Sequence, residues 1–297
     1  MTLSIIIPAF NAASFIADCL ASVVRPGVEV IVVDDGSTDG TGDIVETDFP
    51  AVRVIRQPNQ GVSAARNAGI RSATGDFLAF VDADDRLSPD AVWDGPGLAD
   101  IVIMRSFGAD AERYPWKDLF QDGQTCTAGE IGEKAYVRGS VCGCLFNRKY
   151  LVDNGLYFNE SLSIAEDTVF FANALSARGT VRFRDVRFYE ISERPGSVTR
   201  SLNGDYLRRY GLAVTAAARD IADPVLRVHT CFSLIQGIIM VGTRMGLSSK
   251  AIRTEAGFSA VLPLPTAGIR KDRWKIALLN GCYPLFCFLK RLKSRLS

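Results

Sequence analysis

The sequence contains very little histidine and no excess of charge of either sign. Its 297 residues include one His, 34 Lys and Arg, and 33 Asp and Glu, which gives a formal net charge of +1. The first two hundred residues also contain no repeat of basic and aromatic residues, so neither feature of a nucleic-acid-binding surface is present there. We therefore expect no nucleic-acid partner. Because the overall charge nearly cancels, any site that binds a charged ligand must consist of charged residues that cluster locally.

Cysteine is sparse and unevenly spaced, with seven residues scattered along the chain. An odd number without paired spacing is typical of reduced thiols and argues against a disulfide framework. Cys142 and Cys144 form the one close pair, but no second pair and no histidine pair complete four zinc ligands. We interpret them as buried thiols on a strand.

Long hydrophobic runs are absent as well. The opening "MTLSIIIPAFN" has a mainly apolar stretch of only five residues (3–7) and no basic segment, which predicts a strand rather than a secretory leader. The longest apolar windows, 231–241 and 276–289, fall short of the roughly 20 residues that span a bilayer. We expect no transmembrane helix.

Strands alternate with amphipathic helices through the first hundred residues. Four apolar runs, rich in β-branched residues and without strict alternation, predict the buried strands of a parallel sheet covered by helices on both faces. Expected helix N-caps are Ser37 or Thr38 and, for "AARNAGIRSA", Ser63. The predicted strands are 3–7, 28–33, 52–55 and 77–81. The predicted class is therefore α/β.

Polar residues follow these strands at the point where each one ends. The fourth strand runs into "DADD", which places three carboxylates at Asp82, Asp84 and Asp85. A turn or helix cap accounts for one or two of them. Three carboxylates raise one another's cost of ionisation, and a bound cation offsets this most simply. Oxygen ligands favour Mg²⁺ or Mn²⁺, so the pattern predicts a divalent-ion site at the carboxyl edge of the sheet.

Two common nucleotide-binding motifs are missing from the chain: no G-x-G-x-x-G follows the first strand, and no G-x-x-x-x-G-K-[ST] occurs. Four other motifs, in this order and spacing, resemble family 2 glycosyltransferases of the GT-A fold. Two further motifs, "AEDTVFF" and "RPGSVT", extend the resemblance to about residue 200. The four motifs are "LSIIIPAFNAASFI", "VVDDGSTDGT", "NQGVSAARNAGI" and "GDFLAFVDADDRLSPDA".

The resemblance implies a sugar donor that is a UDP-like nucleotide diphosphate, held with Mn²⁺ or Mg²⁺. Asp84 would be the direct metal ligand, and Asp82 would reach both the ion and the ribose. Arg66 would approach the base or diphosphate, although a surface arginine on a helix is the alternative. The residues implied to bind the nucleotide sugar are Pro8, Ala9, Phe10, Asp34 or Asp35, Arg66, Asp82, Arg194 and Ser197.

The resemblance also implies an inverting transfer in which a carboxylate takes the proton of the acceptor hydroxyl. Asp167 would be this catalytic base, and Glu166 would orient the acceptor or Asp167 itself. A plain alternative is that both acids merely favour the N-terminus of a helix. For Arg194 and Ser197, turn geometry at "RPGSVT" is an equally good explanation.

The helical pattern that begins near residue 204 suggests two regions. We expect a GT-A domain over 1–203, with a donor half to about 105 and an acceptor half over 106–203, followed by a helical extension over 204–297. The tail, 285–297, has apolar residues on one face and a basic cluster beside it, typical of a helix lying on an anionic membrane or docked on the protein.

Together these features predict a metal-dependent glycosyltransferase acting on a glycan or lipid-linked acceptor. We expect a cytoplasmic protein, and the tail leaves open a peripheral contact with the inner face of the cell membrane. The alternatives are a non-catalytic binding or scaffold protein of the same shape, and a nucleotidyltransferase that makes the sugar nucleotide. The latter lacks its expected Gly-rich, Arg-containing loop after Ile7.

Overall fold

The computed structural model describes residues 1–91, 99–108, 120–127, 130–131, 140–192, 204–265, 273–281, 283 and 286–287. By its internal contacts the chain forms two compact units. The first comprises Met1–Ala128, Ser140–Ser163 and Arg178–Glu193, and the second comprises Gly129–Gly139, Ile164–Ala177 and Arg194–Ser297. The domain boundary expected near residue 203 stays a prediction.

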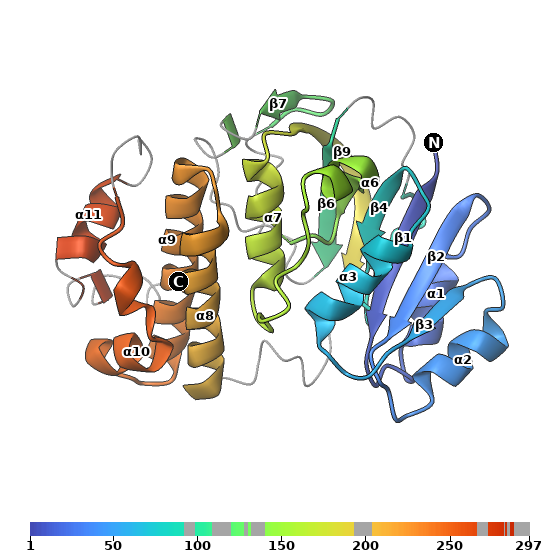
Figure 1. The fold of residues 1–297 in the computed structure, drawn as a ribbon, viewed down its shortest axis with the longest axis horizontal. Coiled ribbons are helices and arrows are strands. Elements are labelled where there is room, and N and C mark those ends of the chain that lie inside the picture. Colours follow the sequence, from blue (N-terminus) through green and yellow to red (C-terminus); the bar gives the residue numbers. More distant parts are fainter. Residues whose placement is uncertain are drawn as a thin grey trace. The chain divides into compact units, whose positions relative to one another are not determined.

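Within the described residues of the first unit, nine strands form one sheet (Figure 1). Eight follow the order β3-β2-β1-β4-β8-β6-β9-β5, and β7 pairs with β9. The four N-terminal strands pair in parallel, whereas β8 pairs antiparallel with β4. The predicted α/β class is confirmed, and the sheet becomes mixed beyond β4. The strands are β1 (Leu3–Ala9), β2 (Val28–Asp34), β3 (Arg53–Arg56), β4 (Phe77–Phe80), β5 (Arg86–Leu87), β6 (Ile101–Gly108), β7 (Thr125–Thr127), β8 (Cys144–Asn147) and β9 (Thr180–Ile191).

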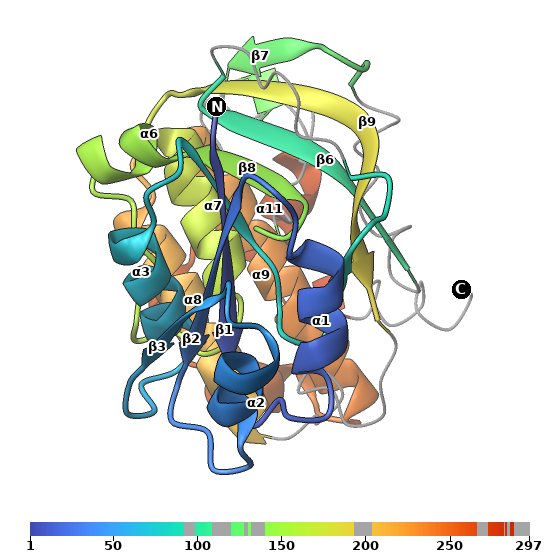
Figure 2. The ribbon, with the colours of Figure 1, turned by 90° about the vertical axis from the view of Figure 1, so that its right-hand side faces the viewer.

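Helices cover both faces of the parallel part of the sheet, as the unbroken apolar strands predict (Figure 2). One core joins Leu3, Ile5 and Ile7 of β1 to the apolar face of α1. On the opposite face α3 approaches β1 so closely that a Cβ at Gly69 would lie 2.3 Å from a methyl carbon of Ile6. The described helices of this unit are α1 (Ile16–Val23), α2 (Thr41–Asp48), α3 (Val62–Ser72) and α6 (Arg148–Asp153).

The predicted helix caps are wrong. The N-cap of α2 is Gly40, because the side chains of Ser37 and Thr38 contact Asn11 instead: the Ser37 hydroxyl oxygen accepts from the Asn11 N–H at 3.0 Å, and the Thr38 hydroxyl donates to Asn11 Oδ1 at 3.4 Å. Ser63 lies inside α3, where its hydroxyl donates to the carbonyl of Leu162.

Helices are the regular elements in the described part of the second unit. The Asp223 carboxylate caps α9 by accepting from the N–H groups of Val225 and Leu226. Helices α8 and α10 pack so tightly that a Cβ on Gly211 would lie 1.6 Å from the carbonyl oxygen of Ala256. The elements are α7 (Glu166–Ser176), α8 (Gly204–Asp220), α9 (Pro224–Arg244), α10 (Ser249–Ala256), the 3₁₀ helix η3 (Phe258–Val261) and α11 (Arg273–Gly281).

Among the described helices, α9 is long and apolar enough to cross a membrane. Of its most apolar stretch, 78% is buried inside the protein. A helix in the core of its own protein has the same composition, so this is weak evidence for a membrane span. The basic tail, apart from residues 286 and 287, lies outside the described residues, and its membrane contact stays a prediction.

Candidate functional site

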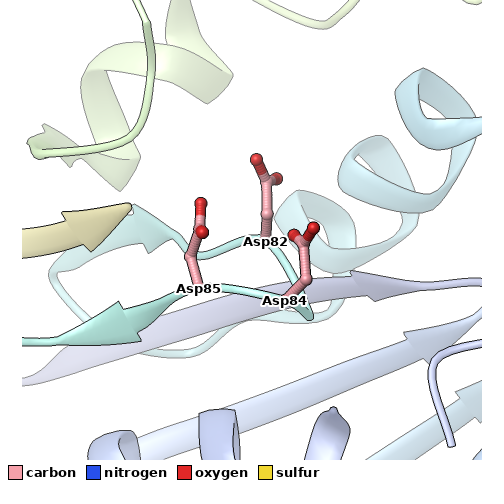
Figure 3. A group of neighbouring side chains, drawn as sticks. All are labelled: Asp82, Asp84 and Asp85. Carbon is pink, nitrogen blue, oxygen red and sulfur yellow. The ribbon is translucent and has the colours of Figure 1, made fainter. Parts of the chain in front are cut away.

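The most acidic point of the sheet's carboxyl edge is the turn that follows β4, from Asp82 to Asp85, which we call the acidic turn. The Asp85 N–H donates to the Asp82 carbonyl at 2.9 Å and closes the turn. The carboxylates of Asp82, Asp84 and Asp85 project to the same side (Figure 3), and each offers an oxygen within 4.8 Å of the others. Three hard oxygen donors at this spacing fit Mg²⁺ or Mn²⁺. Asp84 is the exposed member of the cluster.

Arg66 reaches the acidic turn from α3. Its Nη2 donates to Asp82 Oδ1 at 2.9 Å, and the guanidinium lies 5.2 Å from the ring centroid of Phe158. Only 4% of Arg66 is exposed, so the alternative of a surface arginine is wrong. Its contact with a base or diphosphate stays a prediction.

Cys142 lies on the other side of the same carboxylate, with its Sγ 3.7 Å from Asp82 Oδ2. Burial, and next the neighbouring Asp82 charge, raise the pKa of the Cys142 thiol well above its usual value. Burial likewise raises the pKa of Cys144 to about 12. Both are neutral thiols. The interpretation as buried thiols on a strand is confirmed for Cys144, which opens β8, and is wrong for Cys142, which is half-buried in the turn before that strand.

Asp85 is held by β9. The Tyr189 hydroxyl donates to Asp85 Oδ2 at 2.6 Å, and the Ser192 N–H donates to Oδ1 at 2.8 Å. Burial raises the pKa of Asp85 to about 6 and outweighs these two hydrogen bonds, while the charges of Asp82 and Asp84 add to the rise. Sequence reasoning missed Tyr189. The available signal was that a buried tyrosine needs a partner for its hydroxyl.

A second group of predicted residues meets at the ends of β1 and β2. Ala9 and Asp34 are direct partners in the parallel ladder, and the Asp35 N–H donates to the Ala9 carbonyl at 2.8 Å. Pro8 is half-buried, whereas 51% of Phe10 is exposed. The structure therefore brings Pro8, Ala9 and both aspartates together.

Both of these aspartates are buried and already bonded to the chain. Asp35 accepts from the Gln57 side chain and from the N–H groups of Gln60 and Gly61. Asp34 Oδ1 accepts from the Ser37 N–H at 2.9 Å. They fix the loops around the strand ends, and a contact between either one and a base stays a prediction.

Asp39 is a further residue that the sequence analysis did not single out. Its carboxylate accepts from the Ala13 N–H at 2.9 Å and from the Thr41 N–H at 3.0 Å, which ties the loop after β1 to the start of α2. Burial raises the pKa of Asp39, but the hydrogen bonds from Thr41 and Ala13 outweigh it and lower the pKa below its usual value. This carboxylate stabilises the loop that carries Phe10.

The remaining predicted residues lie elsewhere. Glu166 and Asp167 are the first two residues of α7 and belong to the second compact unit. Both are half-buried, and Asp167 Oδ1 accepts from the Thr168 N–H at 2.7 Å. Arg194 and Ser197 lie outside the described residues. The roles of these four residues stay predictions.

This sheet, with its polar residues gathered beyond β1, β2 and β4, has the GT-A-like fold of nucleotide-diphospho-sugar transferases. The family model "Glycosyl transferase family 2" matches residues 4–94. Residues 4–94 therefore carry a family 2 glycosyl transferase domain.

Curated relatives extend the similarity beyond the matched motifs. The chain is 31% identical to "Uncharacterized glycosyltransferase EpsJ" of Bacillus subtilis (strain 168), over 66% of this chain and 62% of EpsJ. It is 29% identical to "Succinoglycan biosynthesis protein ExoO" of Rhizobium meliloti (strain 1021), over 70% and 68% of the two chains. The chain thus spans less than two thirds of EpsJ.

Solved structures share the fold at low sequence identity. The structure of S. aureus TarS 1–349 in complex with UDP-GlcNAc matches with a TM-score of 0.74, at 20% identity, over 100% of this chain and 92% of that chain. At this identity the likeness shows the fold alone.

Proposed function

We propose that this protein is a glycosyltransferase that moves a sugar from a UDP-like nucleotide diphosphate to a glycan or lipid-linked acceptor, in polysaccharide or glycoconjugate biosynthesis. The family 2 glycosyl transferase domain supports this, as do the names of relatives such as ExoO, a succinoglycan biosynthesis protein. TarS is named a poly(ribitol-phosphate) beta-N-acetylglucosaminyltransferase. The observation that carries the proposal is the acidic turn, whose Asp82 is paired with the buried Arg66 at the carboxyl end of β4.

Asp84 and Asp82 would hold Mn²⁺ or Mg²⁺. Such an ion supplies positive charge that stabilises a departing diphosphate. The Asp84 side chain is exposed and can face a ligand, whereas Asp82 is oriented by Arg66 and Asp85 by β9. In support, a mannosyltransferase of the same fold, PcManGT of Pyrobaculum calidifontis, was solved in complex with GDP-Man and Mn²⁺. The match has a TM-score of 0.55 at 18% identity and covers 98% of this chain and 86% of that chain.

The nucleoside would bind where β1 and β2 end. Phe10 presents an exposed aromatic ring there, beside Pro8 and Ala9. Aromatic rings stack on bases of every kind, so selectivity for a uracil-like edge would come from Asp34 or Asp35. Arg194 and Ser197 would donate to the diphosphate.

Asp167 would act as the general base of an inverting transfer. It would take the proton of the acceptor hydroxyl while that oxygen attacks the anomeric carbon from the face opposite the leaving group. Glu166 would orient the acceptor. Both residues stand in the first turn of α7.

A panel of sugar nucleotides, incubated with the full chain and Mn²⁺ or Mg²⁺, tests the proposal. We expect slow, metal-dependent hydrolysis of one donor with release of free nucleoside diphosphate. Release of pyrophosphate would indicate the nucleotidyltransferase instead. Absence of both products together with tight donor binding would favour the non-catalytic binding protein. If no sugar nucleotide binds more tightly by calorimetry when either ion is added, the metal-dependent proposal is refuted.

For localisation we propose a cytoplasmic protein that contacts the inner face of the cell membrane through the basic tail. The support is the sequence pattern of residues 285–297, in which lysines and arginines flank an apolar face.

A further inference from the structure

We propose that Tyr189 is a positioning residue that holds the acidic turn in its ion-binding shape. The inference rests on the proposed function, because it assumes that Asp82 and Asp84 bind a divalent ion. Tyr189 is separated from the acidic turn by about a hundred residues of sequence and contacts it through its hydroxyl.

The register of β9 places Tyr189 beneath the turn. Leu87 and Arg86 of β5, which directly follow Asp85, are the antiparallel partners of Tyr189 and Glu190. Tyr189 is 1% exposed, so the backbone ladder and the core both fix where its hydroxyl lies. A group fixed in this way can set the position of a more exposed segment.

The hydroxyl bridges the two ends of the turn. It accepts from the Asp82 N–H at 3.2 Å and donates to Asp85 Oδ2 at 2.6 Å. The Ser192 N–H donates to the other oxygen of Asp85 at 2.8 Å. One phenol therefore holds the backbone of the residue that opens the turn and the side chain of the residue that closes it.

These hydrogen bonds give the three carboxylates of the acidic turn different roles. Both oxygens of Asp85 accept hydrogen bonds from β9 and its extension, which makes Asp85 the anchor of the turn. Asp84, which is exposed, and Asp82, which Arg66 orients, then serve as the ion ligands. Without the hydroxyl, the Asp82 N–H and the buried Asp85 oxygen both lose a partner, and the turn can leave its ion-binding shape. An ion would then have to reorder the turn as it binds, which weakens its affinity.

The test is Tyr189→Phe in the full chain, which removes one oxygen atom and keeps the ring. Tyr150→Phe is the matched control, because the Tyr150 hydroxyl also accepts from a backbone N–H of the same unit, that of Gly179 at 2.9 Å. Free Mn²⁺ is followed by electron paramagnetic resonance during titration of the protein without nucleotide. We expect the Kd for Mn²⁺ to rise about tenfold in Tyr189→Phe and to stay within about twofold in the control.

A second readout uses the donor that wild type hydrolyses. The Mn²⁺ concentration giving half-maximal hydrolysis should rise about tenfold in Tyr189→Phe, while kcat at saturating Mn²⁺ stays within about twofold. A merely structural loss would lower the thermal stability of both tyrosine variants and would not change the dependence on Mn²⁺ in either.

Asp85→Ala is the second variant, and it keeps the inference testable if Tyr189→Phe does not fold. This variant removes the carboxylate to which the Tyr189 hydroxyl donates, and we expect it to weaken Mn²⁺ binding even when Tyr189 is intact. Where both variants fold, Tyr189→Phe should cost less affinity in the Asp85→Ala background than in wild type. Additive losses, or equal Kd values for wild type and Tyr189→Phe, overturn the inference and leave the proposed function standing. If wild type binds neither Mn²⁺ nor Mg²⁺, with or without donor, both fail.

Discussion

Replacing Arg66 by glutamine should destabilise the sheet-bearing unit, and Mn²⁺ should restore part of the loss. The Arg66 side chain is 5% exposed and pairs with the Asp82 carboxylate, which is 37% exposed. Breaking a fully buried ion pair costs about 3–5 kcal/mol, whereas an exposed pair contributes about 0–1 kcal/mol. Because water reaches Asp82 but hardly reaches Arg66, we expect a loss of about 2 kcal/mol in the free energy of unfolding.

We expect Mn²⁺ to restore stability because it would bind beside the Asp82 carboxylate, where the Arg66 guanidinium is missing in the variant. In Arg66→Gln, Asp82 keeps a negative charge with no guanidinium beside it. A divalent ion on Asp82 and Asp84 would replace part of the missing positive charge, so the variant should gain more stability from Mn²⁺ than wild type does. Hydrogen exchange of the β4 amides, measured with and without saturating Mn²⁺, reports the opening free energy of this unit directly.

Arg56→Gln is the control for this experiment. Arg56 pairs with Asp43 and Glu46 at the surface, where all three side chains are about half exposed or more. The change in exchange should be clearly smaller than for Arg66→Gln and should not depend on Mn²⁺. If the two variants lose equal stability, or if Mn²⁺ stabilises Arg66→Gln no more than wild type, the reasoning about the Arg66–Asp82 pair is refuted.

Three other predictions concern the site and the tail. Asp84→Ala should abolish turnover with every donor, while Asp167→Asn should lose turnover and keep nucleotide affinity in calorimetry; near-normal rates in either variant would contradict the assignment. Asp39→Asn should weaken donor binding, and its stability deficit should be largest at neutral pH. Because the folded pKa of Asp39 lies below its ordinary value of 3.8, the stability from this carboxylate is lost as the pH falls through the folded pKa, and acid unfolding curves of wild type and variant should converge there. Removing residues 285–297 should reduce flotation with anionic liposomes, and equal flotation would remove the membrane proposal.

The sheet could be predicted because each strand is a run of apolar residues that are adjacent in the sequence. The apolar runs at the positions of β1, β2 and β4 are short and bounded by polar turn residues, which favours buried strands covered on both faces. The predicted caps of α2 and α3 are wrong, because the side chains proposed as caps bond to partners elsewhere in the chain. Ser63 looks like a cap in sequence, but Leu162, far along the chain, accepts its hydroxyl hydrogen.

The candidate site also has one part that the local sequence predicts and one part that it does not. Asp82 and Asp84 stand together in the sequence, so their cluster could be predicted. Tyr189 belongs to β9, where the neighbours Phe188 and Tyr189 are both buried, so alternation along the strand does not show which hydroxyl meets the acidic turn. That contact depends on the pairing of β5 with β9, which no short-range pattern encodes.

The strand that leads into the acidic turn is hydrogen-bonded along both edges, to β1 on one side and to β8 on the other. A strand paired on both edges cannot change its register, so changes in the surface loops further along the chain should not move the residue at which the acidic turn begins. Recombination or deliberate grafting of those loops therefore has a stable platform on which to work. A chimera that keeps residues 1–91, β8 and residues 180–192 and exchanges other surface loops should retain its divalent-ion site while its choice of acceptor changes.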